Sequence, residues 1–331
     1  MNITTRLKQS ALSLVFFCGI LTSIQAQSGF QNFFTPSDTF NKRRVLLASG
    51  FTAATYSAFS IGLFKAWYSK SEQTSFHTFN DFGEWNQMDK VAHGFDSYFQ
   101  TALCYQGARW TGLSKKNSLI LGSSIAMLFQ TTIEVLDGFS PEYGFSLPDV
   151  CFNVIGSGLF VGQQVLWDDQ KFKLKLSAYP KKYSDQEIIG KSGHTTSYQS
   201  RARDLYGSGY FNSVLKDYNA QTFWLSFNPG LFSHKVRSVW PAYLNVAIGY
   251  GSDNLYGGFK NEWVTPNDHY ILESEKRIRQ YYLSLDLDLS KLKVKNHFLK
   301  TGLSIFNIIK IPAPSLEINS KGKVKGHWLF F

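Results

Sequence analysis

Two hydrophobic periodicities divide the chain at about residue 168. Before that point, apolar residues recur at the 3.6-residue spacing of an α-helix, and small residues rather than strand-like alternation interrupt them. The spacing predicts four helices, over residues 45–64, 89–110, 117–136 and 148–167. Each is nearly long enough to cross a membrane, yet each is rich in Gly, Ser, Thr and Gln, so its hydrophobicity is modest. The helical half of the chain is therefore compatible both with a membrane and with an aqueous environment.

After residue 168 the period changes to two. The clearest run alternates Leu283, Leu285, Leu287 and Leu289 with Ser284, Asp286, Asp288 and Ser290. We expect a strand of this kind to place one face in apolar surroundings and the other in water. Similar stretches bring the total to about eight strands, with candidates over residues 172–177, 209–215, 222–228, 242–250, 255–263, 296–306 and 324–331.

These patterns predict an α+β fold, in which an amino-terminal bundle of about four apolar helices precedes an antiparallel β-rich domain. Eight is the smallest number of strands from which membrane barrels are built. The chain also ends on the aromatic Phe331, a feature that we associate with outer-membrane barrels. A small outer-membrane-type barrel is therefore one expectation for the second half. A soluble β-sandwich, or an open sheet packed on the helices, is the alternative.

The first 26 residues predict a secretory signal peptide. Arg6 and Lys8 precede an apolar run, and Ala26 supplies a small residue at the cleavage site. Cys18 follows two phenylalanines that do not suit a lipoprotein cleavage box, so we expect a soluble amino terminus. The predicted organisation is a signal peptide over residues 1–26, a linker over 27–41, a helical domain over 42–168 and a β-rich domain over 169–331.

Removal of the signal peptide leaves two cysteines, Cys104 and Cys151, and both lie in predicted helices. An oxidising compartment would allow them to form a disulfide. Small buried thiols are the interpretation that we favour, because free cysteine is among the most frequently buried residue types.

The excess positive charge belongs to the second half. The chain has 34 Lys and Arg against 24 Asp and Glu, which gives a net charge of +10. Residues 27–168 contain 9 basic and 11 acidic residues (net −2), whereas residues 169–331 contain 23 basic and 13 acidic residues (net +10). Basic residues beside apolar strands suit a membrane lipid or lipopolysaccharide as a partner. A solvated basic surface that preserves solubility is the alternative.

Two classes of partner have no support in the sequence. Nothing indicates a nucleic-acid partner, because no block of five or six like charges occurs. Nothing indicates a nucleotide either, because no phosphate-cradling glycine loop follows a predicted strand.

Three of the predicted helices carry a stripe of polar, mostly ionisable residues. Residues three and four positions apart lie along one helix face. An unpaired carboxylate is costly to bury, so such stripes normally face one another, a cation or water. The stripes consist of Asp89, His93, Asp96 and Gln100 with Lys90 beside them, of Gln130, Glu134 and Asp137, and of Asp149, Asn153 and Gly156.

A metal site is one interpretation of these stripes. His93, Glu134, Asp137 and Asp149 are ligand types that suit a divalent metal with an open coordination position. Such a metal would be the only cofactor that the residues suggest.

Acid–base catalysis is a second interpretation. His93 would be a general base that a neighbouring carboxylate, Glu134 or Asp149, orients. Lys90, Asn153 and Gln130 would then bind the ligand, with Lys90 or Asn153 holding an anionic group.

A structural network is the third interpretation. Lys90 and His93 would neutralise Asp89, Glu134 and Asp149 and so fix the packing of the helices. Three further residues would serve the same structural purpose: Gly138 in the turn after the third helix, Ser146 as the cap of the fourth, and Gly156 at a close helix contact.

The motifs on these helices resemble a known family. The elements Asp89-Lys90-Val91-Ala92-His93, Glu134-Val135-Leu136-Asp137-Gly138 and Ser146-Leu147-Pro148-Asp149, followed by Asn153 and Gly156, are similar to the YfiM-like family of predicted periplasmic lipoproteins, a domain of unknown function. More distantly they resemble the VanZ-like membrane proteins, whose motifs fall in the same order on successive helices. The segment LKDYNAQTFWLS (215–226) and the later Gly249-Tyr250-Gly251 look like the strand-rich extension of this family in Bacteroidetes-type bacteria. The resemblance covers about residues 85–168 and implies no reaction.

Two hypotheses for function follow. The first is an exported cell-envelope protein of the periplasm or outer membrane of a Gram-negative bacterium, in which the polar stripes hold the fold or bind a lipid headgroup while the β-rich half meets the membrane. The second is a metal-dependent or acid–base hydrolase or transferase that acts on a lipid or lipid-linked envelope substrate, with His93, Glu134 and Asp149 as its catalytic residues.

Overall fold

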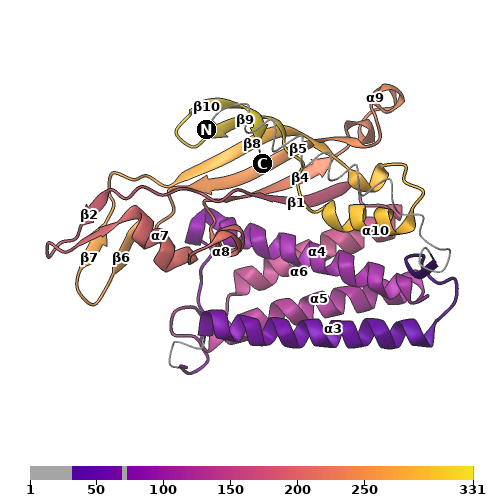
Figure 1. Ribbon diagram of the computed structural model, residues 1–331, viewed down its shortest axis with the longest axis horizontal. Helices are drawn as coiled ribbons and strands as arrows, with labels where there is room; N and C mark the ends of the chain where they lie inside the picture. The colour runs from indigo at the N-terminus through magenta and orange to yellow at the C-terminus, as the bar shows by residue number, and fades with distance from the viewer. Residues whose placement is uncertain (1–31, 69–72, 331) are drawn as a thin grey trace.

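The computed structural model of the chain describes residues 32–68 and 73–330 and arranges them in two layers (Figure 1). Four long helices form one layer, and a six-stranded sheet lies above them, with helix α4 nearest to the sheet and α3 farthest from it. The predicted signal peptide, part of the linker, Cys18 and Phe331 lie outside the described residues.

The four predicted long helices are confirmed, and each begins or ends within a few residues of its predicted bounds. Local capping defines their starts: Asn41, Ser114 and Ser146 each accept a hydrogen bond from a backbone N–H in the first turn of the helix that follows. The helices are α3 (Lys42–Leu63), α4 (Met88–Trp110), α5 (Lys115–Gly138) and α6 (Leu147–Trp167), with single helical turns at Phe64–Tyr68 and Glu84–Gln87.

Helix α4 packs against both α5 and α6, and small residues allow the close approach. A Cβ atom added to Gly156 on α6 would lie 2.0 Å from the carbonyl oxygen of Gly94 on α4. One added to Gly122 on α5 would lie 2.7 Å from the backbone nitrogen of Tyr105 on α4. The helices can cross at these points only because both positions lack a side chain.

Three of these helices, α3, α5 and α6, are long and apolar enough to cross a membrane, judged by length and composition alone. Helix α3 has no buried residue, and it exposes large apolar side chains such as Leu46, Phe51 and Ile61. The described bundle therefore presents much apolar surface on its outside.

The sheet is antiparallel and has the strand order β1-β4-β5-β8-β9-β10. Two small two-stranded sheets, β2 with β3 and β6 with β7, extend beyond it beside α7 and α8 (Figure 1). The strands are β1 (Phe172–Ala178), β2 (Glu187–Ile189), β3 (Thr195–Ser197), β4 (Gln221–Phe227), β5 (Leu244–Asp253), β6 (Glu262–Val264), β7 (His269–Ile271), β8 (Ile278–Leu287), β9 (Ala313–Asn319) and β10 (Val324–Phe330).

The expectation of a barrel is wrong for the described part of the chain, where the main sheet is open. Strands β1 and β10 lie at its two ends. Six strands are fewer than the eight from which the smallest membrane barrels are built. The fold is therefore α+β, with an open antiparallel sheet packed on the helices.

Two predicted strands are helices and so do not join the main sheet. Residues 296–306 form α10 (His297–Phe306), because the Asn296 side chain accepts a hydrogen bond from the Leu299 N–H and caps the helix. Residues 209–215 form most of α8 (Tyr210–Lys216). The remaining short helices are α7 (Tyr198–Tyr206), α9 (His234–Val239), Pro229–Leu231 and Leu289–Lys291.

Two further strand predictions need correction. Only the last residues of the stretch 255–263 are extended, in β6, whereas Leu255 and Tyr256 are buried in the core. Strand β9 was not predicted, because Pro312 and Pro314 interrupt its alternation and proline usually marks the edge of a strand.

The two layers meet through an apolar core between α4 and the sheet. Met88 and Phe95 on α4 pack with Phe223 on β4 and with Leu255, and all four are buried. Cys104 and Cys151 are both free thiols, so no disulfide joins them. Cys151 is exposed rather than buried, contrary to our expectation, because it lies on the outer face of α6.

Candidate functional site

The chain enters α4 through three successive residues in the left-handed backbone region. Trp85, Asn86 and Gln87 have φ angles of 48°, 53° and 62°, which is unfavourable for residues other than glycine. Contacts from the sheet hold this turn: the Tyr250 hydroxyl and an Arg279 N–H, at 2.9 Å, both donate to the Asn86 carbonyl. The start of α4, which carries the polar stripe, is therefore fixed by strands β5 and β8.

Lys90 is the buried centre of the site. Its side chain is 0% exposed, and its ammonium lies 2.7 Å from Asp81 Oδ2, 2.8 Å from Asp89 Oδ2 and 2.6 Å from Asp149 Oδ1. Burial alone would lower the pKa of Lys90, but Asp89 and Asp149 raise it above its usual value. The ammonium is thus charged and engaged by three carboxylates, so it is not available to hold an anionic ligand.

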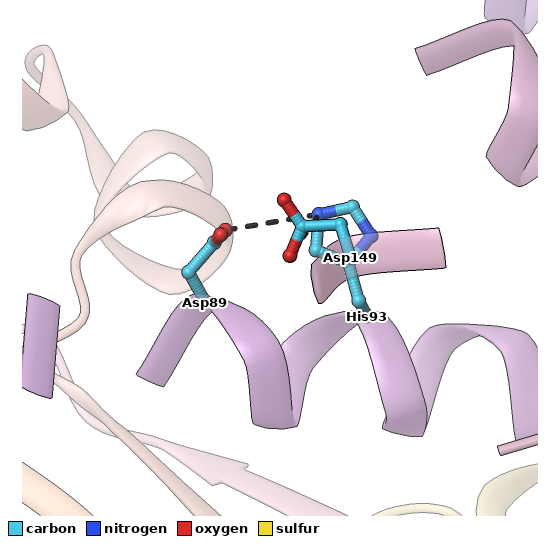
Figure 2. Close-up of side chains that lie close together, drawn as sticks. All are labelled: Asp89, His93 and Asp149. Atoms are coloured by element: carbon cyan, nitrogen blue, oxygen red, sulfur yellow. Dashed lines mark ion pairs between the residues drawn. The ribbon is translucent and has the colours of Figure 1, made fainter. Parts of the chain in front are cut away.

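His93 lies one turn further along α4 and faces carboxylates from three helices. Its Nε2 is 3.8 Å from Asp89 Oδ1 and 3.7 Å from Asp149 Oδ1, and its Nδ1 is 3.7 Å from Glu134 Oε1. Figure 2 shows Asp89 and His93 on successive turns of α4, with Asp149 approaching them from the start of α6. The closest contact of the imidazole, at 3.2 Å, joins Nδ1 to Asn153 Oδ1.

Ser146 connects the three helices at their common end. Its hydroxyl accepts from the Asp149 N–H at 3.1 Å, which caps α6, and donates to Asp81 at 2.6 Å. Its own N–H donates to Glu134 Oε2 at 3.2 Å. The cap predicted at Ser146 therefore also positions two carboxylates of the site.

We name Asp81, Asp89, Lys90, His93, Glu134 and Asp149 the helical cluster. Four carboxylates face two cations there, so the cluster has a net charge of −2 when every group is ionised. This imbalance shifts the proton affinities of its members.

The pKa values follow from burial and from neighbouring charges. Burial would lower the pKa of His93, but Asp89, Asp149 and Glu134 raise it to about 9. Burial raises the pKa of Glu134 to about 8 and, together with the charge of Asp89, also raises that of Asp149. Burial would raise the pKa of Asp89, but His93 and Lys90 hold it below its usual value. Near neutral pH the cluster therefore holds protons on His93 and Glu134.

Several buried polar atoms of the site have no hydrogen-bond partner. Glu134 is 1% exposed and its Oε1 makes no hydrogen bond, although its Oε2 does. Gln130 lies one turn earlier on α5, is also 1% exposed, and has neither its amide oxygen nor its amide nitrogen paired. Buried polar groups normally pair with protein, ordered water or a ligand, so these atoms are free, within the described residues, to bind water or a ligand.

The remaining predicted residues take up different positions. Asp137 accepts a hydrogen bond from the Tyr68 hydroxyl at 2.6 Å and is not among the residues around His93 that could share one metal ion. Gly138 is the last residue of α5, where a Cβ atom would lie 2.3 Å from the Phe76 ring. Asp89, which we expected to be structural and neutralised by Lys90 and His93, lies 2.8 Å from the Lys90 ammonium and 3.8 Å from His93 Nε2.

A metal would find a partial ligand set here. Asp89, His93 and Asp149 each offer one ligand atom, and these atoms lie within 4.8 Å of one another. The donor types suit a divalent ion, but the Lys90 ammonium lies 2.6 Å from Oδ1 of Asp149. A fixed positive charge at that distance opposes a second cation on the same carboxylate, so the residues fit a metal poorly.

Two residues of the site were missed at the sequence level. Asp81 lies in the loop before α4, and the Tyr218 hydroxyl, from the segment between α8 and β4, donates to Asp89 Oδ1 at 2.6 Å. Neither residue belongs to a helical stripe, so periodicity could not identify them. The only available signal was that Tyr218 falls in the segment 215–226 that resembles the family extension.

One comparison with known proteins gives a match, and it covers the segment that contains the site. Residues 78–162 match the family described as "Predicted periplasmic lipoprotein (DUF2279)", and this segment contains the whole helical cluster. The resemblance to a predicted periplasmic lipoprotein domain is thereby confirmed for about a quarter of the chain. No curated protein and no solved structure matches the chain.

Proposed function

We propose that the protein is an exported cell-envelope protein of the periplasm or outer membrane, and that its helical cluster binds the positively charged headgroup of a membrane lipid or lipid-linked molecule. One observation carries the proposal: Glu134 is buried, its Oε1 accepts no hydrogen bond within the described residues and has only His93 Nδ1, at 3.7 Å, as an ionic neighbour, in a cluster of four carboxyl groups and two cationic side chains.

The chemistry of the cluster favours a ligand that carries an ammonium group. A primary ammonium offers three donors and no acceptor, which suits the unpaired Glu134 Oε1 and the amide oxygen of Gln130. An anionic group would face net negative charge, and Lys90 is already paired with three carboxylates. A headgroup that presents an amine, such as ethanolamine, therefore fits better than one that presents only phosphate.

Three members of the cluster are partly exposed. The side chains of Asp89, Asp81 and His93 are 20%, 13% and 13% exposed, whereas that of Lys90 is 0% exposed. A headgroup would approach past Asp89 and His93, while Lys90 stays in the interior and holds the three carboxylates in place. Binding would let Glu134 give up its proton to solvent, because the ammonium replaces that positive charge.

Lipid selectivity tests this proposal. The mature protein is mixed with micelles that contain phosphatidylethanolamine and phosphatidylcholine with the same acyl chains, and bound lipid is counted by native mass spectrometry. We expect phosphatidylethanolamine to be favoured about 10-fold, since choline cannot donate a hydrogen bond and one charged hydrogen bond contributes roughly 1.5 kcal/mol or more. Glu134→Gln should bring the ratio close to one.

A matched variant controls for the loss of one charge. Glu142→Gln removes the same charge from an exposed position four residues after Gly138, and we expect it to keep the lipid preference. Equal binding of the two lipids by the unmodified protein, or a preference that survives Glu134→Gln, would contradict the proposal.

A metal-dependent hydrolase acting on a lipid-linked substrate is the second candidate, and the grouping of Asp89, His93 and Asp149 within 4.8 Å favours it. Elemental analysis of the purified protein and of His93→Ala separates the two candidates. Stoichiometric metal that disappears in the variant supports the hydrolase and displaces the headgroup proposal.

A further inference from the structure

The strands of the main sheet form three cross-strand rows of apolar side chains on one face. The register places Leu283 of β8 opposite Ile248 of β5 and Leu316 of β9, so that the middle row crosses the sheet. The rows are Leu176, Phe223, Tyr250, Tyr281, Ile318 and Val324, then Leu174, Leu225, Ile248, Leu283 and Leu316, then Phe172, Phe227, Val246 and Leu285.

The opposite face of the sheet is buried, and beside an aromatic cluster of Trp224 and Tyr282 it carries buried charged side chains. Lys175 on β1 pairs with Asp286 on β8 at 2.7 Å, and both side chains are 0% exposed. Lys173 pairs with Asp288 at 2.7 Å on the same face, and Lys310 lies over the Trp224 ring. We name Lys173, Lys175, Asp286, Asp288 and Lys310 the sheet cluster. A sheet with one solvated face has the reverse arrangement, with its apolar side inside.

Only part of the apolar face is covered. Phe223 is buried against α4, but Ile248, Leu283, Leu316 and Ile318 are 51%, 52%, 44% and 47% exposed. We call the exposed part, on β5, β8 and β9, the apolar band. A groove of about 280 Å³ between α4 and the sheet, lined by Phe95, Leu225 and Ile248, continues the band toward the helices.

The basic residues beyond the strand ends and the length of the apolar band along β8 indicate what covers it. Basic residues lie beyond both ends of β8: Lys276, Lys321 and Lys323 are exposed at one end, and Lys291, Lys293 and Lys295 at the other. Such residues pair well with anionic headgroups. The band is roughly 13 Å high from Tyr281 to Leu285, at about 3.3 Å per residue, which is close to half of the ~30 Å hydrocarbon core of a bilayer.

We infer that the apolar band enters one leaflet of a phospholipid membrane, with the basic strand ends at the headgroups. A span of the whole bilayer is excluded by the height of the band. The alternative, in which the apolar band stays exposed to water, is unfavourable because soluble proteins rarely expose a contiguous apolar surface. The inference concerns a different part of the chain from the headgroup site, so either proposal can fail while the other holds.

Quenching of tryptophan emission by brominated acyl chains tests the inference at the apolar band itself. The result does not depend on whether the long helices also contact the membrane. The mature Leu283→Trp protein is reconstituted into vesicles of phosphatidylethanolamine and phosphatidylglycerol with brominated acyl chains, and the extra tryptophan emission is measured against the unmodified protein. We expect bromine to quench more than half of the extra emission. Leu316→Trp, on the neighbouring strand, should give the same result if Leu283→Trp folds poorly.

Ile189→Trp is the matched control, because Ile189 is 70% exposed on β2, outside the main sheet. We expect its extra emission to be unaffected by bromine. Equal quenching at positions 189 and 283 overturns the inference. So does the absence of quenching at 283 together with a dimer in sedimentation, since a second copy of the chain would then cover the band.

Discussion

Both halves of the molecule bury charged side chains, but they differ in how completely the carboxylates are paired. In the sheet cluster, each aspartate has several donors: Asp286 accepts from Lys175, the Ser226 hydroxyl and the Ile311 N–H. In the helical cluster, three carboxylates share one lysine, and Glu134 Oε1 accepts no hydrogen bond within the described residues.

This difference separates a structural role from a binding role. A buried ionic network that satisfies all its members stabilises one arrangement of the chain. A network that has fewer cations than carboxylates, and acceptors without hydrogen bonds, can still bind a ligand. It stabilises the fold less than a fully satisfied network does. The helical cluster lies within the segment that matches the lipoprotein family, whereas the sheet cluster lies outside it.

Removal of the central lysines should give the largest effect. Lys90→Met leaves three carboxylates without their cation, and we expect a loss of more than about 5 kcal/mol in the free energy of unfolding, enough to prevent folding. Lys175→Met leaves only Asp286 unpaired and should lose on the order of 3 to 5 kcal/mol. Chemical denaturation in mild detergent measures both.

Double variants sharpen that comparison. Lys175→Met with Asp286→Leu should recover at least half of the lost stability, because no unpaired charge remains. Lys90→Met with Asp149→Leu should recover little, because Asp81 still lacks its lysine and Asp89 keeps only His93, at 3.8 Å, as a cation. If the two double variants recovered the same share of the lost free energy of unfolding, the two clusters would not differ in how their carboxylates are paired.

The pH dependence of stability is the next effect in size. Asp89, Glu134 and Asp149 face His93 and raise its pKa from 6.5 to about 9. The folded chain therefore binds this proton more tightly than the unfolded chain, and stability from His93 is full below pH 6.5 and lost as the pH rises through 9. The shift corresponds to roughly 3 kcal/mol.

His93→Gln should reduce the fall in stability between pH 6.5 and 9, most clearly above the pKa of about 8 of Glu134, measured as the denaturation midpoint at each pH. His234→Gln, in the exposed helix α9, provides the control and should leave the curve unchanged. A wild-type midpoint that rises over this range would contradict the charge assignment of the helical cluster.

The smallest effects concern single polar side chains. Gln130→Leu should leave stability unchanged or raise it by about 1 kcal/mol, because the buried amide has no partner to lose. Ser226→Ala should lower it by about 1 to 2 kcal/mol, because the hydroxyl donates to Asp286 at 2.6 Å. Thermal unfolding of both variants checks the contrast. If Gln130→Leu destabilised the protein, the Gln130 amide would already have a hydrogen-bond partner in the absence of a ligand.

The sequence by itself determined the helices and the candidate site stripes. Apolar periodicity and the cap at Ser146 are local properties, so they identified α4, α5 and α6 and placed His93, Glu134 and Asp149 on these three helices. Sequence reasoning failed at α10, where the Asn296 cap outweighs an apparent alternation. It also failed at β9, where prolines hide the strand.

Only the tertiary structure decided which residues meet. Asp81 and Tyr218 join the helical cluster from loops far apart in the sequence, and Asp137 turns instead to Tyr68. The alternation of leucines with serines and aspartates along β8 showed that the two faces of the strand differ. It did not show which face is buried in the protein. The structure buries Asp286 and exposes Leu283, because lysines from another strand satisfy the aspartates, and such pairing depends on strand order rather than on local sequence.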